Sequence, residues 1–254
     1  MTTRSFELRE FFHLAFLKHF SPKLSGRPYA VKGGVCLRFF HRSQRLSQDM
    51  DLDVTSETDR HRLADLVDAV LQSQAFHATL ASAGIRRIAA TKPKQTDTVQ
   101  RWKVALHLSD ANPLPTKIEF SRRATSIASS AGTPDVGLLQ RYGMGPFAVR
   151  YYGAPEMAAQ KIRAMASDSR FAVRDLFDLH HLFRAAGVVP SDLTGRIEPT
   201  DLTAATEKAG RFTYRDFREQ VFPYLPADLS DLYANPEPFE TLQHEVEEIL
   251  TGML

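Results

Sequence analysis

The 254-residue sequence contains a single cysteine, Cys36, so no disulfide bond can form within the chain. It also lacks any apolar run near the ~20 residues of a membrane-spanning helix, and residues 1–10 lack the hydrophobic core of a signal peptide. Its 43% hydrophobic and 24% charged residues are typical of a globular protein with one large domain or a compact pair. We therefore expect a cytoplasmic protein without a membrane span, in which Cys36 is a buried core residue rather than a nucleophile.

Acidic residues are scarce in the first three quarters of the chain. Residues 187–254 contain five Lys or Arg and thirteen Asp or Glu, which leaves 27 basic and 17 acidic residues for residues 1–186. A basic surface attracts phosphate groups over long distances, so this asymmetry favours a protein that handles nucleotides or nucleic acids. The alternative is a mixed surface whose charges are solvated or paired with one another.

A glycine pair, Gly33 and Gly34, separates the apolar residues 29–31 from a second apolar run at residues 35–40. This order predicts a strand, a tight turn and a helix, because glycine adopts the backbone angles that such turns require. The first turn of the helix would expose backbone N–H groups. These groups are suited to binding a phosphate.

Aspartates alternate with apolar residues shortly afterwards, in the run Asp49-Met50-Asp51-Leu52-Asp53-Val54. Because side chains alternate along a strand, the three carboxylates would share one face, where they repel one another unless a cation is bound. An EF-hand loop is excluded, since it needs Gly at the place of Val54 and Glu at the place of Arg60. A solvated acidic strand edge is the remaining alternative.

The two segments together resemble a known signature. Lys32-Gly33-Gly34 followed by Arg45-Leu46-Ser47-Gln48-Asp49-Met50-Asp51-Leu52 is similar to the Lys-Gly-Gly-Thr-x-Leu and Arg-x-Ser-x-Asp-x-Asp motifs of the AbiEii/AbiGii-type toxin nucleotidyltransferases. That family includes the MenT-like toxins and belongs to the superfamily of DNA polymerase beta. The resemblance implies an α+β fold, with a mixed sheet flanked by helices and followed by a C-terminal helical region.

The resemblance also implies roles for individual residues. Asp49 and Asp51 would be the metal-binding pair, and Asp53 a supporting or structural acid. The nucleotide-binding residues would be Lys32, Gly33, Gly34, Arg45 and Ser47, of which Arg45 and Ser47 also shape the turn before the strand. Val35 departs from the family pattern, which has Thr or Ser there, so a hydroxyl that could contact a phosphate is missing.

The remaining pattern predicts the other elements. We expect helices over residues 4–20 and about 60–83, the second with a capped start at residues 56–59 and an end at Gly84. Strands are expected at residues 85–90, 99–108 and 117–121, separated by turns at 91–94 and 110–113, and a long surface connection at 121–145. Helices are expected from Pro155 and from Val173. These elements divide into two domains, residues 1–152 and 153–254.

Glu119 is the best candidate for a third metal-binding carboxylate. It lies between Ile118 and Phe120, which would face the core, so its own side chain lies on the other face of the strand. In the superfamily, a third acid on a neighbouring strand completes the metal site or takes a proton from the attacking hydroxyl. The alternative is an exposed Glu119 that pairs with Lys117 or Arg122.

The strand region is also the most basic part of the chain. Residues 86–123 contain nine Lys or Arg against three acids. Trp102 lies within this segment and could stack on a base, although its neighbours Val104 and Leu106 are more typical of a core position.

The helical half contains two further segments similar to family motifs, Glu156-x-x-x-x-Lys161 and Arg174-Asp175-x-x-Asp178. By that resemblance, Lys161 contacts the triphosphate of the donor, and Asp175 supports Lys161 or the metal site. Arg174 and Asp178 are four residues apart and could form an ordinary surface pair. His180 and His181 have no partner at metal-ligand spacing, which argues against a zinc site.

The function that the sequence predicts is Mg²⁺-dependent nucleotidyl transfer. Asp49, Asp51 and Glu119 would hold two Mg²⁺ ions, for which Mn²⁺ could substitute, and the glycine turn and Lys161 would hold the NTP donor. The resemblance points to an RNA acceptor, the 3′ end of tRNA, and to an antitoxin as partner. Two alternatives remain, a protein-modifying nucleotidyl- or phosphotransferase on the same scaffold and a non-catalytic binding module.

Overall fold

The computed structural model describes residues 3–24, 26, 28–109 and 112–254 of the chain. The chain divides into two compact units, the first comprising Met1–Phe40 and Ser47–Tyr152 and the second His41–Leu46 and Gly153–Leu254. Residues 41–46, which we expected in the first domain, therefore belong to the second unit. Across the described residues, no helix is both long and apolar enough to cross a membrane.

The first unit contains a mixed sheet of seven strands in the order β3-β4-β5-β2-β1-β7-β6. The β1–β7 and β2–β5 pairs are parallel, and the other four pairs are antiparallel. The strands are β1 (Tyr29–Lys32), β2 (Asp49–Thr55), β3 (Arg87–Gln95), β4 (Val99–His107), β5 (Leu114–Ala124), β6 (Ser130–Gly132) and β7 (Val149–Tyr151). The predicted mixed sheet is thus confirmed, with β2 near its centre.

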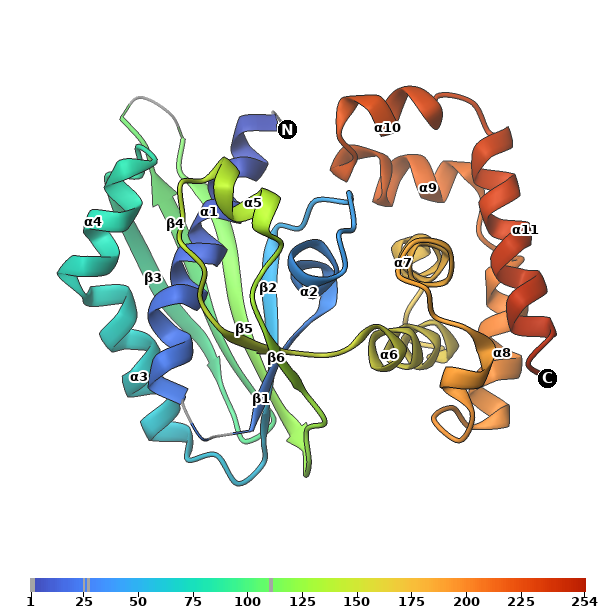
Figure 1. Cartoon of the computed structure of the whole chain (residues 1–254), viewed down its shortest axis with the longest axis horizontal. Coiled ribbons are helices and arrows are strands. Elements are labelled where there is room, and N and C mark those ends of the chain that lie inside the picture. Colours follow the sequence, from blue (N-terminus) through green and yellow to red (C-terminus); the bar gives the residue numbers. More distant parts are fainter. Residues whose placement is uncertain (1–2, 25, 27, 110–111) are drawn as a thin grey trace. The chain divides into compact units, whose positions relative to one another are not determined.

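Helices pack against this sheet (Figure 1). They are α1 (Thr3–Phe20), the 3-10 helix η1 (Ser21–Leu24), α2 (Gly33–Phe40), α3 (Arg60–Gln72), α4 (Gln74–Ser82) and α5 (Val136–Arg141). Helices α1, α3 and α4 pack on the apolar face, where Phe20 and Trp102 contact the ring of Phe120. Helix α2 also lies on the apolar face, where Arg38 donates from Nε to Glu10 of α1 at 2.6 Å and the Phe40 ring stacks on Tyr151. The aspartates of β2 point to the opposite face. The prediction that Cys36 is a buried core residue is confirmed.

Several predicted boundaries were wrong. The helix expected over residues 60–83 is broken at Ser73, whose backbone is extended and whose Oγ accepts a hydrogen bond from the Phe76 N–H, so that Ser73 caps α4. Residues 91–94, expected to be a turn, continue β3 through a register shift. The expected connection at 121–145 contains the end of β5, β6 and α5. The predicted turn at 110–113 includes residues 110–111, which are outside the described residues.

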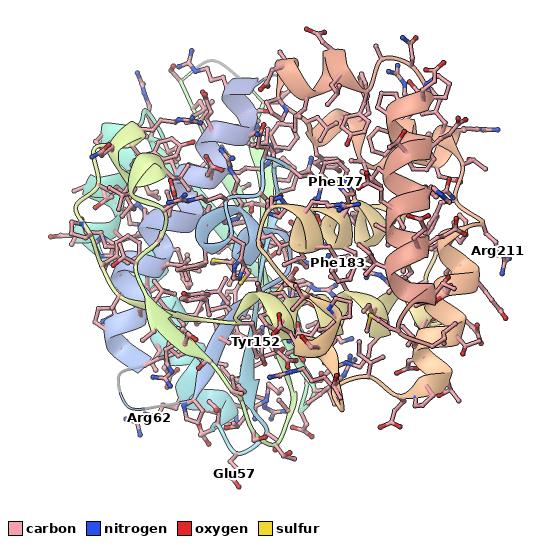
Figure 2. All side chains as sticks on the ribbon, turned by 45° about the vertical axis from the view of Figure 1, so that its right-hand side comes forward. Glu57, Arg62, Tyr152, Phe177, Phe183 and Arg211 are labelled. Carbon is pink, nitrogen blue, oxygen red and sulfur yellow. The ribbon has the colours of Figure 1, made fainter. Side chains whose placement is uncertain are left out.

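The second unit is helical. Its elements are α6 (Ala154–Ala166), α7 (Val173–Arg184), η2 (Pro190–Leu193), α8 (Pro199–Ala209), α9 (Tyr214–Gln220), η3 (Phe222–Tyr224), α10 (Ala227–Leu232) and α11 (Glu237–Thr251). Aromatic rings form much of its core: Phe177 of α7, labelled in Figure 2, lies 6.0 Å from the ring centroids of both Phe217 and Tyr233. The segment 41–46 is tied to this unit by a hydrogen bond from the Leu46 N–H to the Tyr224 carbonyl.

Candidate active site

The aspartates of β2 lie beside β5 on one face of the sheet. In the parallel pairing of these strands, Asp49 is opposite Lys117 and Asp51 is opposite Glu119. Side chains of paired residues point to the same face, because neighbouring strands share the phase of their pleat. Met50 and Leu52 point the other way and are fully buried. The alternation seen in the sequence therefore brings the three predicted metal-binding acids to one face.

These three acids converge on the ammonium group of Lys117. Its Nζ lies 3.6 Å from Asp49 Oδ2, 3.6 Å from Asp51 Oδ1 and 3.6 Å from Glu119 Oε2. On the far side, Arg101 of β4 donates from Nε to Glu119 Oε2 at 2.5 Å. Glu119 thus pairs with Lys117, as the alternative interpretation of the sequence expected, and lies beside both aspartates as well.

The charges in this cluster shift one another's pKa values. Burial raises the pKa of Asp51, and the nearby Lys117 only partly opposes that effect. Burial would also raise the pKa of Glu119, but the hydrogen bond from Arg101 and the charge of Lys117 outweigh it, so this pKa is lowered. The three acids together raise the pKa of Lys117 above its usual value, despite the opposing effect of burial. The ammonium is therefore a permanent cation among the acids at neutral pH.

The three carboxylates of Asp49, Asp51 and Glu119 are chemically suited to bind a divalent cation. Within the described part of the chain, no three His, Cys, Asp or Glu side chains are already close enough to hold an ion without rearrangement. The three acids instead surround an ammonium, which shows that this position favours positive charge. Carboxylate oxygens are the donors that Mg²⁺ prefers. Asp49, Asp51 and Glu119 are thus the residues that would hold it.

The glycine turn lies directly against Asp51. Gly33 is the first residue of α2 and has a φ of +68°, which side chains rarely adopt. A Cβ at Gly33 would also meet Asp51 Oδ2 at 3.2 Å. Glycine is therefore favoured at this position for two reasons, the backbone angle and the close approach to Asp51. The next position but one, Val35, is buried in the core.

Lys32 and Asp53 form a separate pair next to the acids. Lys32 Nζ donates to Asp53 Oδ1 at 2.5 Å, and the Tyr152 hydroxyl donates to Asp53 Oδ2 at 2.9 Å. Asp53 is 8% exposed and both its oxygens have partners, so the structure gives it a supporting contact rather than a place among the converging acids. Ser47 donates from Oγ to the Asp49 carbonyl at 3.0 Å, which shapes the turn before β2.

A second cluster of charges lies inside the helical unit. Lys161 of α6 lies 2.8 Å from Asp175 Oδ1 and 2.6 Å from Asp178 Oδ2, both on α7. Arg45 makes a two-pronged contact with Asp178, with Nε and Nη2 each 2.8 Å from a carboxylate oxygen. Arg170 donates to Asp175 Oδ2 at 2.7 Å. The predicted contact between Asp175 and Lys161 is therefore present.

The second cluster is almost completely buried. Asp178 is 0% and Asp175 1% exposed, while Arg45 and Lys161 are 5% and 8% exposed. Burial opposes ionisation of the two acids, but the neighbouring Arg45, Lys161 and Arg170 outweigh it and lower the pKa of both carboxyls. For Lys161, burial is outweighed by the two aspartates, which raise its pKa. All of these groups are therefore charged at neutral pH.

Sequence reasoning missed parts of both clusters. The alternative of a surface pair between Arg174 and Asp178 does not occur, because Asp178 is buried against Arg45 and Lys161 instead. The spacing of Asp175 and Asp178, three residues apart on one helical face, was the available signal. The sequence pattern indicates Lys117 only as a partner of Glu119, although the two are two positions apart and lie on one strand face beside the aspartates. Trp102 is fully buried, which confirms the core interpretation.

The chain resembles known proteins in sequence and in structure. It matches the family described as nucleotidyl transferase AbiEii toxin, type IV toxin–antitoxin system, over residues 15–251. No curated protein sequence matches it. Two solved structures of comparable fold are JHP933 from Helicobacter pylori and the nucleotidyltransferase toxin MenT4 from Mycobacterium tuberculosis H37Rv.

The structural matches extend over most of the chain. JHP933 has a TM-score of 0.57 and 19% identity, covering 99% of this chain and 95% of its own. MenT4 has a TM-score of 0.53 and 15% identity, covering 82% of this chain and 67% of its own. At such identities the structures indicate a shared fold, whereas the sequence match spans nearly all of the chain. The protein therefore belongs to the AbiEii family of toxin nucleotidyltransferases.

Proposed function

We propose that this toxin transfers a nucleoside monophosphate from an NTP to an RNA acceptor, the 3′ end of tRNA, and so blocks translation. The observation that carries the proposal is the convergence of Asp49, Asp51 and Glu119 around one cationic group, with Gly33 of the predicted phosphate-binding turn against Asp51. The AbiEii family consists of nucleotidyltransferases, and carboxylates beside a glycine turn are suited to holding a metal-bound triphosphate for nucleotidyl transfer. Both NTP donors and tRNA occur in the cytoplasm, where we expect the toxin to act.

Each part of the chain has a distinct task in this proposal. Asp49, Asp51 and Glu119 hold Mg²⁺, two ions or equivalent Mn²⁺, which would neutralise charge on the phosphates and on the departing pyrophosphate. The N–H groups at Gly33 and Gly34 bind phosphate oxygens at the start of α2. Ser47 shapes the turn that carries Asp49 into place.

Lys32, Arg45 and Lys161 require a separate test as nucleotide-binding residues. Each is engaged with a carboxylate, Lys32 with Asp53, Arg45 with Asp178 and Lys161 with both Asp175 and Asp178. In our proposal Lys161 still contributes positive charge to the triphosphate, held in orientation by Asp175. Replacement of Lys161 by Met should then raise the KM for the NTP, measured on variant protein that is still folded.

The test is incubation of the purified protein with total RNA, Mg²⁺ and each of the four labelled NTPs, followed by separation on a gel. We expect label on an RNA of tRNA length, and its loss in Asp49→Asn and in Asp51→Asn. Label on protein instead of RNA would support the alternative of a protein-modifying transferase. Absence of label with all four NTPs would contradict the proposal.

An antitoxin is the expected partner, since the family belongs to type IV toxin–antitoxin systems. In such a pair, the antitoxin should relieve growth inhibition by the toxin. Co-expression of the neighbouring gene product with the toxin tests this expectation directly.

A further inference from the structure

The face of the sheet that carries the acids continues outward over β4 and β3. The charged side chains on that outer part are all basic. The register places Arg101 of β4 next to Glu119, and Lys103 of β4 next to Lys117. One strand further out, Lys94 of β3 lies opposite Arg101. Two rows of side chains therefore lead from the acids on β2 and β5 to the edge strand.

Three cations on these outer strands, Arg87, Lys94 and Lys103, are exposed and define what we call the basic sheet face. Neither β3 nor β4 contains an acidic residue. In the described part of the chain, Lys94 and Lys103 form no salt bridge, and Arg87 contacts only the ring of His107. Their charge is therefore available for a ligand, unlike that of Arg101, which binds Glu119.

One pair on this face is unfavourable by itself. Lys103 lies directly opposite Lys117, and like charges in that position destabilise a sheet. Lys117 is compensated by the three acids, but Lys103 is not. An uncompensated lysine beside another cation is stabilised when a polyanion binds.

The side chains between the cations are too small to recognise bases. Thr91 is opposite Lys103, and Ala89 is opposite Ala105. The one aromatic ring other than histidine on these strands, Trp102, is buried on the opposite face, where its N–H donates to Asp68 at 2.9 Å. A stacking platform for bases is absent from β3 and β4, so the face offers charge alone.

From these observations we infer that the basic sheet face binds the phosphate backbone of the acceptor RNA next to its reacting end, independently of base sequence. The inference rests on the proposed function, since the acids must receive the end of that RNA. Arg87 and Lys94 are seven residues apart along β3, roughly 20 Å, so the face is long enough for several nucleotides. An acidic protein, such as an antitoxin, is a different occupant and is distinguished by the test.

The test measures binding of a labelled single-stranded RNA of mixed sequence by fluorescence anisotropy at several NaCl concentrations. The variant carries Arg87→Gln, Lys94→Gln and Lys103→Gln together. Because this variant lacks the three cations that would bind phosphates, we expect binding roughly tenfold weaker and a slope of log affinity against log salt smaller by about 2. A second RNA of unrelated sequence should give the same change.

The matched control removes three exposed basic residues from helices on the opposite face, with Lys18→Gln, Lys23→Gln and Arg62→Gln. It has the same net charge as the test variant, so it should lose little affinity and keep the salt slope if position rather than total charge matters. A third variant, Lys94→Arg with Lys103→Arg, keeps the charge and should bind as the wild type does. Circular dichroism checks that all variants are folded.

The outcomes separate this inference from the proposed function. Equal losses in the test and control variants would show only a general charge effect and would overturn the inference. The same holds if the test variant binds RNA normally while losing affinity for the antitoxin. If salt-dependent RNA binding needs the basic sheet face but no NTP labels RNA, the inference stands and the proposed function fails. If labelling occurs and the test variant keeps its KM for RNA, the inference alone fails.

Discussion

Lys117 acts as the resident counter-ion of the acid cluster, since its ammonium is 3.6 Å from all three carboxylates. Replacing it by Met leaves the acids without that charge, and we expect a loss of about 1 to 2 kcal/mol in metal-free buffer because the group is partly exposed. Added Mg²⁺ should restore this loss, so that the variant's Tm rises more with Mg²⁺ than the wild type's.

Lys103→Met is the control for Lys117, because Lys103 is its cross-strand neighbour but contacts none of the acids. Its Tm should change little with chelator or Mg²⁺. If Lys117→Met is as stable as the wild type in chelator and gains nothing from Mg²⁺, the acids do not form a cation site.

Glycine is favoured at position 33 by both the backbone angle and the close approach to Asp51. Gly33→Ala should lower the free energy of unfolding by about 2 kcal/mol and reduce nucleotidyl transfer, because either α2 or Asp51 must move. Gly84→Ala is the control, since Gly84 has a φ of +82° but open space around it. It should lose stability from the angle alone, with transfer unchanged. Urea unfolding and the labelling assay measure the two effects.

At the level of elements, α6 and α7 are joined by a buried ion cluster. Removing one charge from it with Asp178→Asn leaves Arg45 and Lys161 incompletely paired, and we expect a loss of about 3 kcal/mol at pH 7. Asp168→Asn, at an exposed acid between the same helices, should cost almost nothing.

The pH dependence of this cluster follows from the lowered pKa values of Asp175 and Asp178. Folded-state pKa values below the unfolded value mean that the stabilisation is complete above about pH 4 and is lost as the pH falls further. Urea unfolding at pH 7 and pH 3 should therefore show a smaller pH effect in Asp178→Asn than in the wild type. Equal pH effects would contradict the assignment.

Helix α1 is connected to β5 and to the residue before β2 by hydrogen bonds that begin at His13. Thr116 of β5 donates its hydroxyl hydrogen to the Gln48 carbonyl, so it accepts from His13 Nε2, and His13 Nδ1 has no partner among the described residues. Burial lowers the pKa of His13 to about 3, with Arg9 adding to the effect. This chain of contacts connects the core to the residue before Asp49.

Because His13 is buried in its neutral form, the free energy of unfolding should decrease as the pH falls through the mildly acidic range. The unfolded state binds a proton near pH 6.5 and the folded state near pH 3, so stability should fall by up to about 1.4 kcal/mol per pH unit below pH 6. In His13→Gln this part of the slope should disappear, whereas His61→Gln, at an exposed histidine, should keep it. Chemical unfolding between pH 7 and 5 measures the slope, and an unchanged slope in His13→Gln would falsify the assignment.

At the scale of the whole molecule, the decisive property is toxicity. Expression of the wild type should arrest bacterial growth. The double variant Asp49→Ala with Asp51→Ala should not, because its rate of nucleotidyl transfer should be lower by a factor of about 10² to 10³ or more. Asp168→Ala should remain toxic. Growth arrest that survives loss of both aspartates would favour a non-catalytic binding module. Immunoblots must show equal amounts of each protein.

Much of the fold could be predicted because it depends on local periodicity. The alternation of Asp49 to Val54 defines which side of β2 faces the core, and the apolar spacing of residues 4–20 defines α1, since burial selects these patterns wherever the chain places them. The break at Ser73 and the continuation of β3 through residues 91–94 were missed, because capping and strand pairing override weak local preferences.

The sequence alone therefore determined the family, the sheet with its acidic face, and the identity of the acids and glycines, since these depend on short-range spacing. Tertiary structure decided which charges meet. Lys117 among three carboxylates, and Arg45 on Asp178 across 133 residues of chain, result from strand register and helix packing. No periodicity encodes such contacts, because the free energy of an ion pair depends on distance and burial, which exist only once the chain has folded.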